Sequence, residues 1–171
     1  MKEKANTIEF INDIADEVLA EIIALEKILF PEPLQTEPER IKEIIMNPET
    51  ISVIAYCDRG KVAGYIASRH HHEAYEDLKD ADTSFSLEPG ALYLEAIAIR
   101  PDLQGKGYFG KLMTKFLEGV GGKPITMHAR VVNNCSLGMQ KYGARFERSV
   151  EDWQGSGESF DYLVIPGRSE S

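Results

Sequence analysis

The spacing of apolar residues predicts a short strand and a long amphipathic helix at the start of the chain. Residues 7–11 have the composition of the strand. The helix ends near Phe30, because Pro31 and Pro33 cannot continue it. Its buried face is predicted from the apolar positions that recur at helical spacing, which are Ile11, Ile14, Ala15, Val18, Leu19, Ile22 and Leu25.

A shorter helix and a hairpin follow. Thr36, with Glu39 three residues later, is typical of a capping box, and the helix that it opens runs to Met46. The β-branched and apolar residues of 51–68 then predict two strands around a turn at 58–60, which reads Asp-Arg-Gly.

The middle of the chain holds the two clearest patterns. Residues 92–99 form a nearly continuous apolar run, which predicts a strand buried on both faces that Pro101 ends. The preceding residues 70–90 are polar and acidic and predict an irregular loop. From Phe109 an apolar stripe predicts a strong helix, which glycines terminate; its positions are Leu112, Met113, Phe116, Leu117 and Val120.

The last third of the chain predicts three strands and one short helix. The strands are residues 125–132, 145–150 and 160–165, and the helix is residues 136–142. The order βααβββαβαββ implies an α/β fold with a mixed, mostly antiparallel central sheet flanked by helices. We expect one domain over residues 1–171.

Composition and charge indicate a globular domain and exclude some classes of binding partner. The chain has 171 residues, of which 43% are hydrophobic and 27% charged, fractions that are ordinary for a globular domain. The formal charge of −9 and the lack of a basic run argue against binding nucleic acid or an anionic membrane surface.

Three absences predict where the protein works. The two cysteines form no CxxC pattern, which predicts a reducing compartment. The first residues lead into no apolar signal segment, and charged residues interrupt the longest apolar stretch, residues 18–30. We therefore expect a cytoplasmic protein, as a monomer or a homodimer.

The segment Gln104-Gly105-Lys106-Gly107-Tyr108-Phe109-Gly110 is the sharpest motif. It lies between the apolar strand and the strong helix, where glycines let backbone amides approach an anion and the helix N-terminus adds positive potential. A bare turn is the simplest alternative. A P-loop spacing is present as well, but Leu112 stands where Ser or Thr would hold Mg²⁺. A dinucleotide fingerprint fits less well, because no acidic residue closes a second strand.

A third interpretation accounts for more of the chain. The stretch from Ala96 to Gly107, AIAIRPDLQGKG, resembles the acetyl-CoA signature of the GNAT superfamily of N-acetyltransferases. Residues 130–136, RVVNNCS, resemble that family's next strand and the asparagine that begins its next helix. Residues 143–146, GARF, resemble its Gly-Phe exit, and the element order matches from about residue 7 to 165.

The resemblance implies transfer of an acetyl group from acetyl-CoA to an amine in one ternary complex, without a metal. It implies that the backbone of Ile97, Ala98 and Ile99 faces the thioester, while the glycine loop from Gln104 to Gly110 binds the pyrophosphate. It also assigns Asn133 to the acetyl-CoA site. Two departures are present: Phe109 stands where the family has Gly or Ala, and the position of the family's catalytic Tyr is Gln140, with Tyr142 two residues further.

An attacking alkylamine must lose a proton, since its solution pKa is near 10.4. Glu95, the only charged residue in the 92–99 run, and His128, on the adjacent strand, are the candidate bases. Each has a structural alternative: a paired carboxylate for Glu95 and a hydrogen-bonded core imidazole for His128. Tyr142 is the candidate acid that the resemblance offers.

The acceptor side is predicted only broadly. The family places its acceptor near the loops 30–34 and 151–158, which makes Phe30, Glu32 and Trp153 candidate contacts. Together with the acidic 70–90 segment these loops favour a cationic amine. A binding module that holds acyl-CoA without turnover, as a sensor or scaffold, is the alternative function.

Two further motifs are interpreted as structural. Three consecutive histidines, 70–72, rarely chelate one ion, because side chains alternate along a strand, so we expect no metal there. Cys135 lies at a helix start but lacks an evident base, which favours a packing role over a nucleophile.

Overall fold

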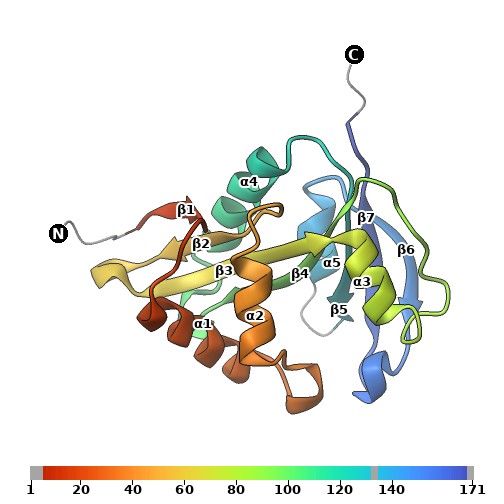
Figure 1. Ribbon diagram of the computed structural model, residues 1–171, viewed down its shortest axis with the longest axis horizontal. Coiled ribbons are helices and arrows are strands. Elements are labelled where there is room, and N and C mark those ends of the chain that lie inside the picture. Colours follow the sequence, from red (N-terminus) through yellow and green to blue (C-terminus); the bar gives the residue numbers. More distant parts are fainter. Residues whose placement is uncertain (1–5, 132–134, 169–171) are drawn as a thin grey trace. The chain divides into compact units, whose positions relative to one another are not determined.

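The computed structural model describes residues 6–131 and 135–168. Figure 1 shows the arrangement of the chain, which is an α/β fold with seven strands in the order β1-β2-β3-β4-β5-β7-β6. The elements are β1 (Ile8–Phe10), α1 (Asp16–Leu29), α2 (Pro38–Ile45), β2 (Val53–Tyr56), β3 (Val62–His70), α3 (His71–Leu78), β4 (Leu92–Ile99), α4 (Tyr108–Val120), β5 (Ile125–Arg130), α5 (Cys135–Gln140), β6 (Arg145–Val150) and β7 (Phe160–Ile165).

The sheet is mixed and mostly antiparallel, as predicted. β4 runs parallel to β5, whereas the pairs β1–β2, β2–β3, β5–β7 and β6–β7 are antiparallel. By its contacts the chain forms two compact units: Met1–Ser68 with Glu95–Gly121, and Arg69–Leu94 with Gly122–Ser171. We call them the first and the second unit.

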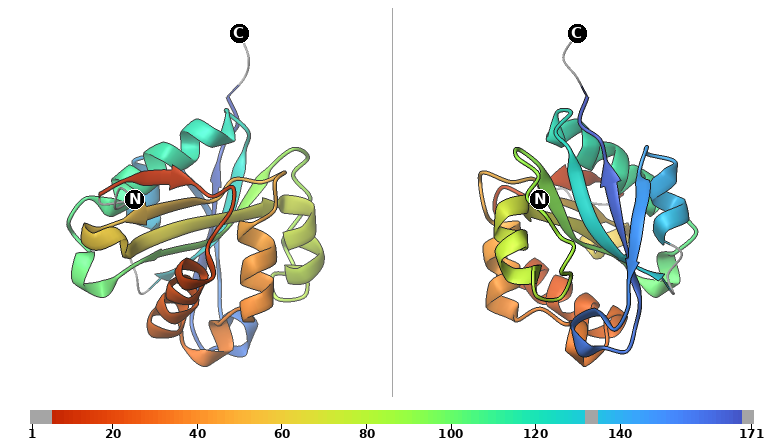
Figure 2. Two further views of the ribbon diagram at one scale, coloured as in Figure 1. Left: turned by 60° about the vertical axis from the view of Figure 1, so that its left-hand side comes forward. Right: turned by 90° about the vertical axis from the view of Figure 1, so that its right-hand side faces the viewer.

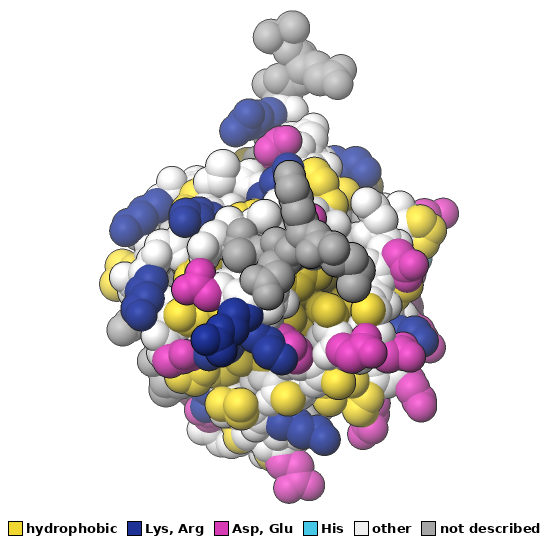
Figure 3. Space-filling view, turned by 90° about the vertical axis from the view of Figure 1, so that its left-hand side faces the viewer, with side chains coloured by type: hydrophobic (Ala, Val, Ile, Leu, Met, Phe, Trp, Pro, Cys, Tyr) yellow, Lys and Arg dark blue, Asp and Glu magenta, His cyan; other side chains and the backbone are white. Residues whose placement is uncertain are grey.

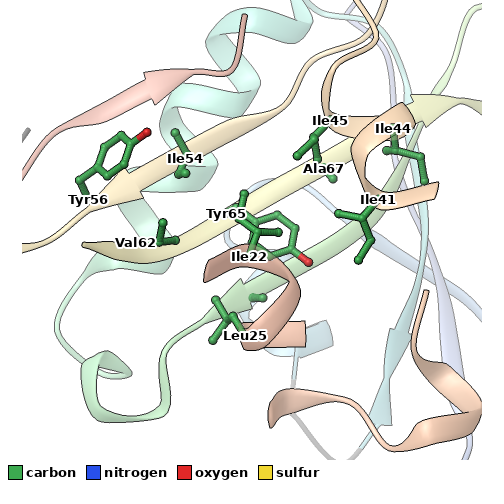
Figure 4. Packing of buried hydrophobic residues seen from close by; sticks show 11 residues of the cluster. Ile22, Leu25, Ile41, Ile44, Ile45, Ile54, Tyr56, Val62, Tyr65 and Ala67 are labelled. Carbon is green, nitrogen blue, oxygen red and sulfur yellow. The ribbon is translucent and has the colours of Figure 1, made fainter. Parts of the chain in front are cut away.

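In the first unit, helices cover both faces of the strands. α1 and α2 lie on one face and α4 on the other (Figure 2, left). The α1 and α2 side contributes the buried cluster of Figure 4: Ile22, Leu25, Ile41, Ile44, Ile45, Ile54, Tyr56, Val62, Tyr65, Ala67 and Ala98. On the α4 side a Cβ at Gly119 would lie 2.6 Å from the Phe10 ring, so glycine permits the close approach of α4 to β1.

In the second unit, β5, β7 and β6 lie between α3 and α5 (Figure 2, right). The register pairs His128 of β5 with Tyr162 of β7. Phe85 packs its ring against five other rings of this unit, including those of His71, Tyr93 and His128. This unit therefore has an aromatic core, in contrast to the mainly aliphatic cluster of the first unit.

The N-terminal helices begin later than the sequence predicts. α1 begins at Asp16, while Ile11 and Ile14 pack against the core cluster from the non-helical segment before it. α2 begins at Pro38, after a cap residue that makes no side-chain hydrogen bond. The predicted capping box does not form, because the amide of Thr36 donates to Glu26 Oε1 at 2.5 Å instead.

Two other expectations are corrected. The segment 70–90, predicted as irregular, contains α3, whose buried positions His71, Ala74 and Leu78 lie at helical spacing. β4 has its predicted bounds, but Glu95, Ala96 and Ile97 are only half-buried. The hairpin and the last two strands are found as predicted.

Candidate active site

The glycine loop follows β4 in the first unit. Gln104 Nε2 donates to the carbonyl of Ile99 at 3.3 Å and so ties the loop to the strand end. Arg100 also braces the turn through two hydrogen bonds to the carboxylate of Asp102, at 3.1 and 2.8 Å. The start of the loop is thus fixed by local contacts.

Two glycines give this loop its path. Gly105 has φ +78° and Gly107, the N-cap of α4, has φ +90°, a region that other residues rarely adopt. A Cβ at either position would meet no atom within 4 Å, so the space beside both is open. The first helical hydrogen bond of α4 runs from the amide of Lys111 to the carbonyl of Gly107. The amides of Tyr108, Phe109 and Gly110 therefore precede the hydrogen bonds that run along the helix. This backbone can bind an anion.

Two carboxylates of the first unit, those of Glu26 and Glu95, lie close enough to interact electrostatically. Glu26 of α1 is buried, with 4% of its surface exposed, and burial raises its pKa, with a further contribution from the charge of Glu95. Burial, followed by the charges of Glu26 and Glu95, also raises the pKa of Tyr65. Sequence reasoning missed Glu26, although a charged residue four positions after Ile22, on the apolar face of the helix, was the available signal.

His128 lies at the centre of a buried polar chain in the second unit. Its Nε2 lies 2.9 Å from Asp82 Oδ2 and its Nδ1 lies 2.7 Å from the hydroxyl of Tyr93. Arg148 holds the same carboxylate, with Nε 3.3 Å from Asp82 Oδ1 and its Nη2 on Oδ2. The ring stacks on Trp153 with 4.2 Å between ring centroids. Both ring nitrogens are therefore engaged.

The pKa shifts of His128 and Asp82 show which atoms of this hydrogen-bonded group carry protons. Burial lowers the pKa of His128 to about 4, against the opposing effect of Asp82. Burial alone would raise the pKa of Asp82, but hydrogen bonds from Arg148 and His128 outweigh it and the pKa is lowered. Because a carboxylate only accepts, the neutral imidazole donates from Nε2 to Asp82 and accepts the Tyr93 hydroxyl proton at Nδ1.

The remaining candidates fall in different surroundings. Phe30 ends α1, where its carbonyl accepts a hydrogen bond from Gln35, and Glu32 is exposed in the next turn. Trp153 is buried against His128. α5 ends at Gln140, and the amide of Tyr142 donates to Met139, so Tyr142 lies in a turn and not in the predicted helix. Asn133 lies outside the described residues.

The histidine tract and Cys135 have structural surroundings. His71 is buried, with Nδ1 2.6 Å from Thr126 Oγ1 and Nε2 2.7 Å from the carbonyl of Ser86. Burial raises the pKa of Cys135 to about 11, which disfavours a thiolate. Within residues 6–131 and 135–168, no group of three side chains is arranged to hold a metal ion.

Comparison with known families gives the identity of the fold. The sequence profile described as the acetyltransferase (GNAT) family matches residues 19–136, more than half of the chain. The chain belongs to the acetyltransferase (GNAT) family. A comparison with curated proteins finds no match. No helix in the described part of this GNAT protein is long and apolar enough to cross a membrane.

Solved structures share the GNAT fold at low sequence identity. The ribosomal-protein-S18-alanine N-acetyltransferase from Escherichia coli is 14% identical, with a TM-score of 0.70 over 97% of this chain and 96% of its own. Arabidopsis thaliana NAA60 in complex with acetyl-CoA is 16% identical, with a TM-score of 0.69 over 92% and 97%. The GphF GNAT-like decarboxylase in complex with isobutyryl-CoA is 13% identical, with a TM-score of 0.66 over 95% and 100%. Such likeness shows the fold, and the reaction must be argued from the site.

Proposed function

We propose that this GNAT protein transfers an acetyl group from acetyl-CoA to a primary amine by direct attack in a ternary complex. The observation that carries the proposal is the glycine loop after β4. Its left-handed Gly105 and Gly107, together with the first-turn amides of α4 that precede its helical hydrogen bonds, form a backbone anion site. The pyrophosphate of CoA suits this site, because amides and the helix dipole both favour negative charge.

The strand that leads into the loop supports the second requirement of the reaction. Charge develops on the thioester oxygen during attack and needs a donor that is already in position. We assign this role to the backbone amides of Ile97 and Ile99, with Ala98 between them, in the half-buried part of β4. The new C–N bond forms as the C–S bond breaks, and the thiol leaves as CoA.

Glu95 is the base that we favour for the amine proton. Its carboxylate belongs to the half-buried part of β4 and lies close enough to Glu26 to raise the pKa of that group. His128 is the less suitable candidate, because Asp82 and Tyr93 engage both of its nitrogens and burial holds its pKa at about 4. A neutral, fully bonded imidazole is a weak proton acceptor at neutral pH.

The charge distribution supports a cationic acceptor. On the face seen in Figure 3, Asp and Glu side chains are more frequent in the right half and Lys and Arg side chains in the left half. In the first unit, α1 and the turn after it carry Asp16, Glu17, Glu21 and Glu32, whereas α4 and its loop carry Lys106, Lys111 and Lys115. An ammonium is attracted to the former and the phosphates of CoA to the latter.

The proposal is tested by following thiol release from acetyl-CoA with a panel of amines that includes small amines, polyamines, peptide N-termini and lysine peptides. We expect release above the rate without protein for at least one cationic amine. Binding of acetyl-CoA in calorimetry without release for any amine would favour the alternative, a non-catalytic acyl-CoA-binding module. If the protein neither binds acetyl-CoA nor releases thiol from it, both functions are contradicted.

A further inference from the structure

β6 forms one edge of the sheet in the second unit. It pairs with β7 on one side, and the strand order ends with it on the other (Figure 1). Within residues 6–131 and 135–168, the outer side of β6 makes no backbone hydrogen bond. An unpaired edge of this kind can pair with a strand of another chain.

The first half of β6 exposes an apolar side chain between two charged ones. Phe146 has 54% of its surface exposed, although it lies opposite the fully buried Leu163 of β7. The side chains of Arg145 and Glu147 are 66% and 40% exposed, and Arg145 Nη2 lies 3.6 Å from Glu147 Oε1. The two charges therefore lie on one face of β6, and the Phe146 ring points to the other face.

The order of the two charges makes this edge complementary to itself. A second copy related by a two-fold axis presents its β6 antiparallel to the first. With the axis at Phe146, Arg145 of each copy lies opposite Glu147 of the other copy, and the two Phe146 rings are neighbours. Opposite charges and aromatic rings stabilise such cross-strand pairs, whereas like charges destabilise them. An axis at Arg145 or at Glu147 would instead place two like charges opposite each other.

Charged residues and bulges usually protect a sheet edge, and both are present in β6. Glu147 lies in a bulge, opposite no residue of β7. Charges of a single sign would repel a second copy, but Arg145 and Glu147 differ in sign, so two copies related by the two-fold axis attract each other. The bulge limits the paired segment to a few residues. We therefore expect a small interface and a reversible dimer.

We propose that two copies of this protein form a homodimer in which β6 pairs with β6 in the antiparallel register centred on Phe146. The inference goes beyond the proposed acetyl transfer and does not depend on it, because the glycine loop belongs to the first unit and β6 to the second.

The experiment measures the mass of the protein by analytical ultracentrifugation, from low micromolar to several hundred micromolar concentrations. We expect the mass of wild type to rise from that of a monomer to that of a dimer. Arg145→Glu and Glu147→Arg should each weaken the dimer roughly tenfold or more, because each variant sets like charges opposite each other at both cross-strand pairs. The two variants change the net charge in opposite directions, so a shared loss cannot come from net charge.

Two further samples test the register. The double variant Arg145→Glu/Glu147→Arg restores opposite charges at both pairs and should form the dimer again. An equimolar mixture of the two single variants should form a mixed dimer for the same reason. Phe146→Ser should also weaken the dimer. The control Leu87→Ser removes another exposed apolar side chain of the second unit and should leave the dimer unchanged.

Three results would overturn the proposal. They are a wild type that stays monomeric over the whole series, a dimer that persists in both single variants, and single variants that neither the double exchange nor mixing restores. Thermal melting of each variant checks that the fold is intact. The ion pair between Arg145 and Glu147 within one chain is exposed, so its loss should change the melting temperature little.

Discussion

Replacing His128 by glutamine should reduce the dependence of stability on pH. The imidazole is buried and neutral in the folded protein, where its pKa is about 4 against 6.5 for an ordinary histidine. As the pH falls below 6.5 the unfolded chain gains a proton that the folded chain cannot accept until about pH 4. Stability is therefore lost on acidification through this range. Glutamine can still donate to Asp82 but does not titrate.

The size of the effect follows from these two pKa values. Proton linkage between pKa 6.5 in the unfolded chain and about 4 in the folded one removes about 2 kcal/mol of unfolding free energy between pH 7 and pH 5. Asp82 does not add to this loss, because its pKa is lowered in the folded state and its contribution declines only below the ordinary carboxyl range. The constant loss of the His128 stacking on Trp153 cancels when one variant is compared at two pH values.

The assay is urea unfolding at pH 7 and pH 5. We expect the difference between the two unfolding free energies to be about 2 kcal/mol smaller in His128→Gln than in wild type. His72→Gln, an exposed histidine on α3, is the matched control and should keep the wild-type difference. An unchanged difference in His128→Gln would refute a buried neutral imidazole. Coincident transitions by fluorescence and circular dichroism would also support the prediction of one domain.

Three other predictions concern the site. Gly107→Trp should weaken acetyl-CoA binding in calorimetry at least tenfold by filling the open space beside the loop. The matched control Gly143→Trp, with the same φ of +90° and equally open surroundings, should leave the affinity unchanged. CoA should raise the melting temperature and MgATP should not, because Leu112 offers Mg²⁺ no oxygen; stabilisation by MgATP alone would restore the P-loop interpretation. Glu95→Gln should lower kcat/KM by roughly 10²–10⁴, and by less at high pH, where more of the amine is already deprotonated. Tyr142→Phe should lower kcat/KM by less than about tenfold. A larger loss of kcat/KM in Tyr142→Phe than in Glu95→Gln would assign the proton transfer to Tyr142.

Elements with a clear hydrophobic pattern could be predicted from the sequence, as the continuous apolar run of β4 and the periodic stripe of α4 illustrate. α3 was missed because its buried stripe begins with His71, which counts as polar in a sequence pattern but is satisfied by Thr126 and Ser86 in the fold. The start of α1 was placed too early because apolar residues outside the helix fit the helical spacing. Ile11 and Ile14 are apolar because they reach the core from a non-helical segment, and spacing cannot separate such residues from a helix.

The glycine loop could be predicted because its chemistry is local. Glycines, a preceding strand and a following helix are adjacent in sequence, so the loop and its amides follow from about a dozen residues. The surroundings of His128 could not be predicted in this way. Asp82 is 46 residues away in sequence and Arg148 reaches that carboxylate from 66 residues away, so no local pattern announces them.

The surroundings of His128, which only the fold reveals, distinguish the two candidate bases. An unperturbed histidine is well suited to proton transfer at neutral pH, and on sequence alone His128 and Glu95 stand level. The fold surrounds His128 with Phe85, Tyr162 and Trp153 and engages both nitrogens, which favours the neutral form and leaves no lone pair for an amine. A catalytic imidazole would have to break its hydrogen bond to Asp82 or to Tyr93 in every turnover. Glu95 lies in the half-buried part of β4, close enough to Glu26 to raise the pKa of that group, and its carboxylate is therefore where we look first for the proton transfer.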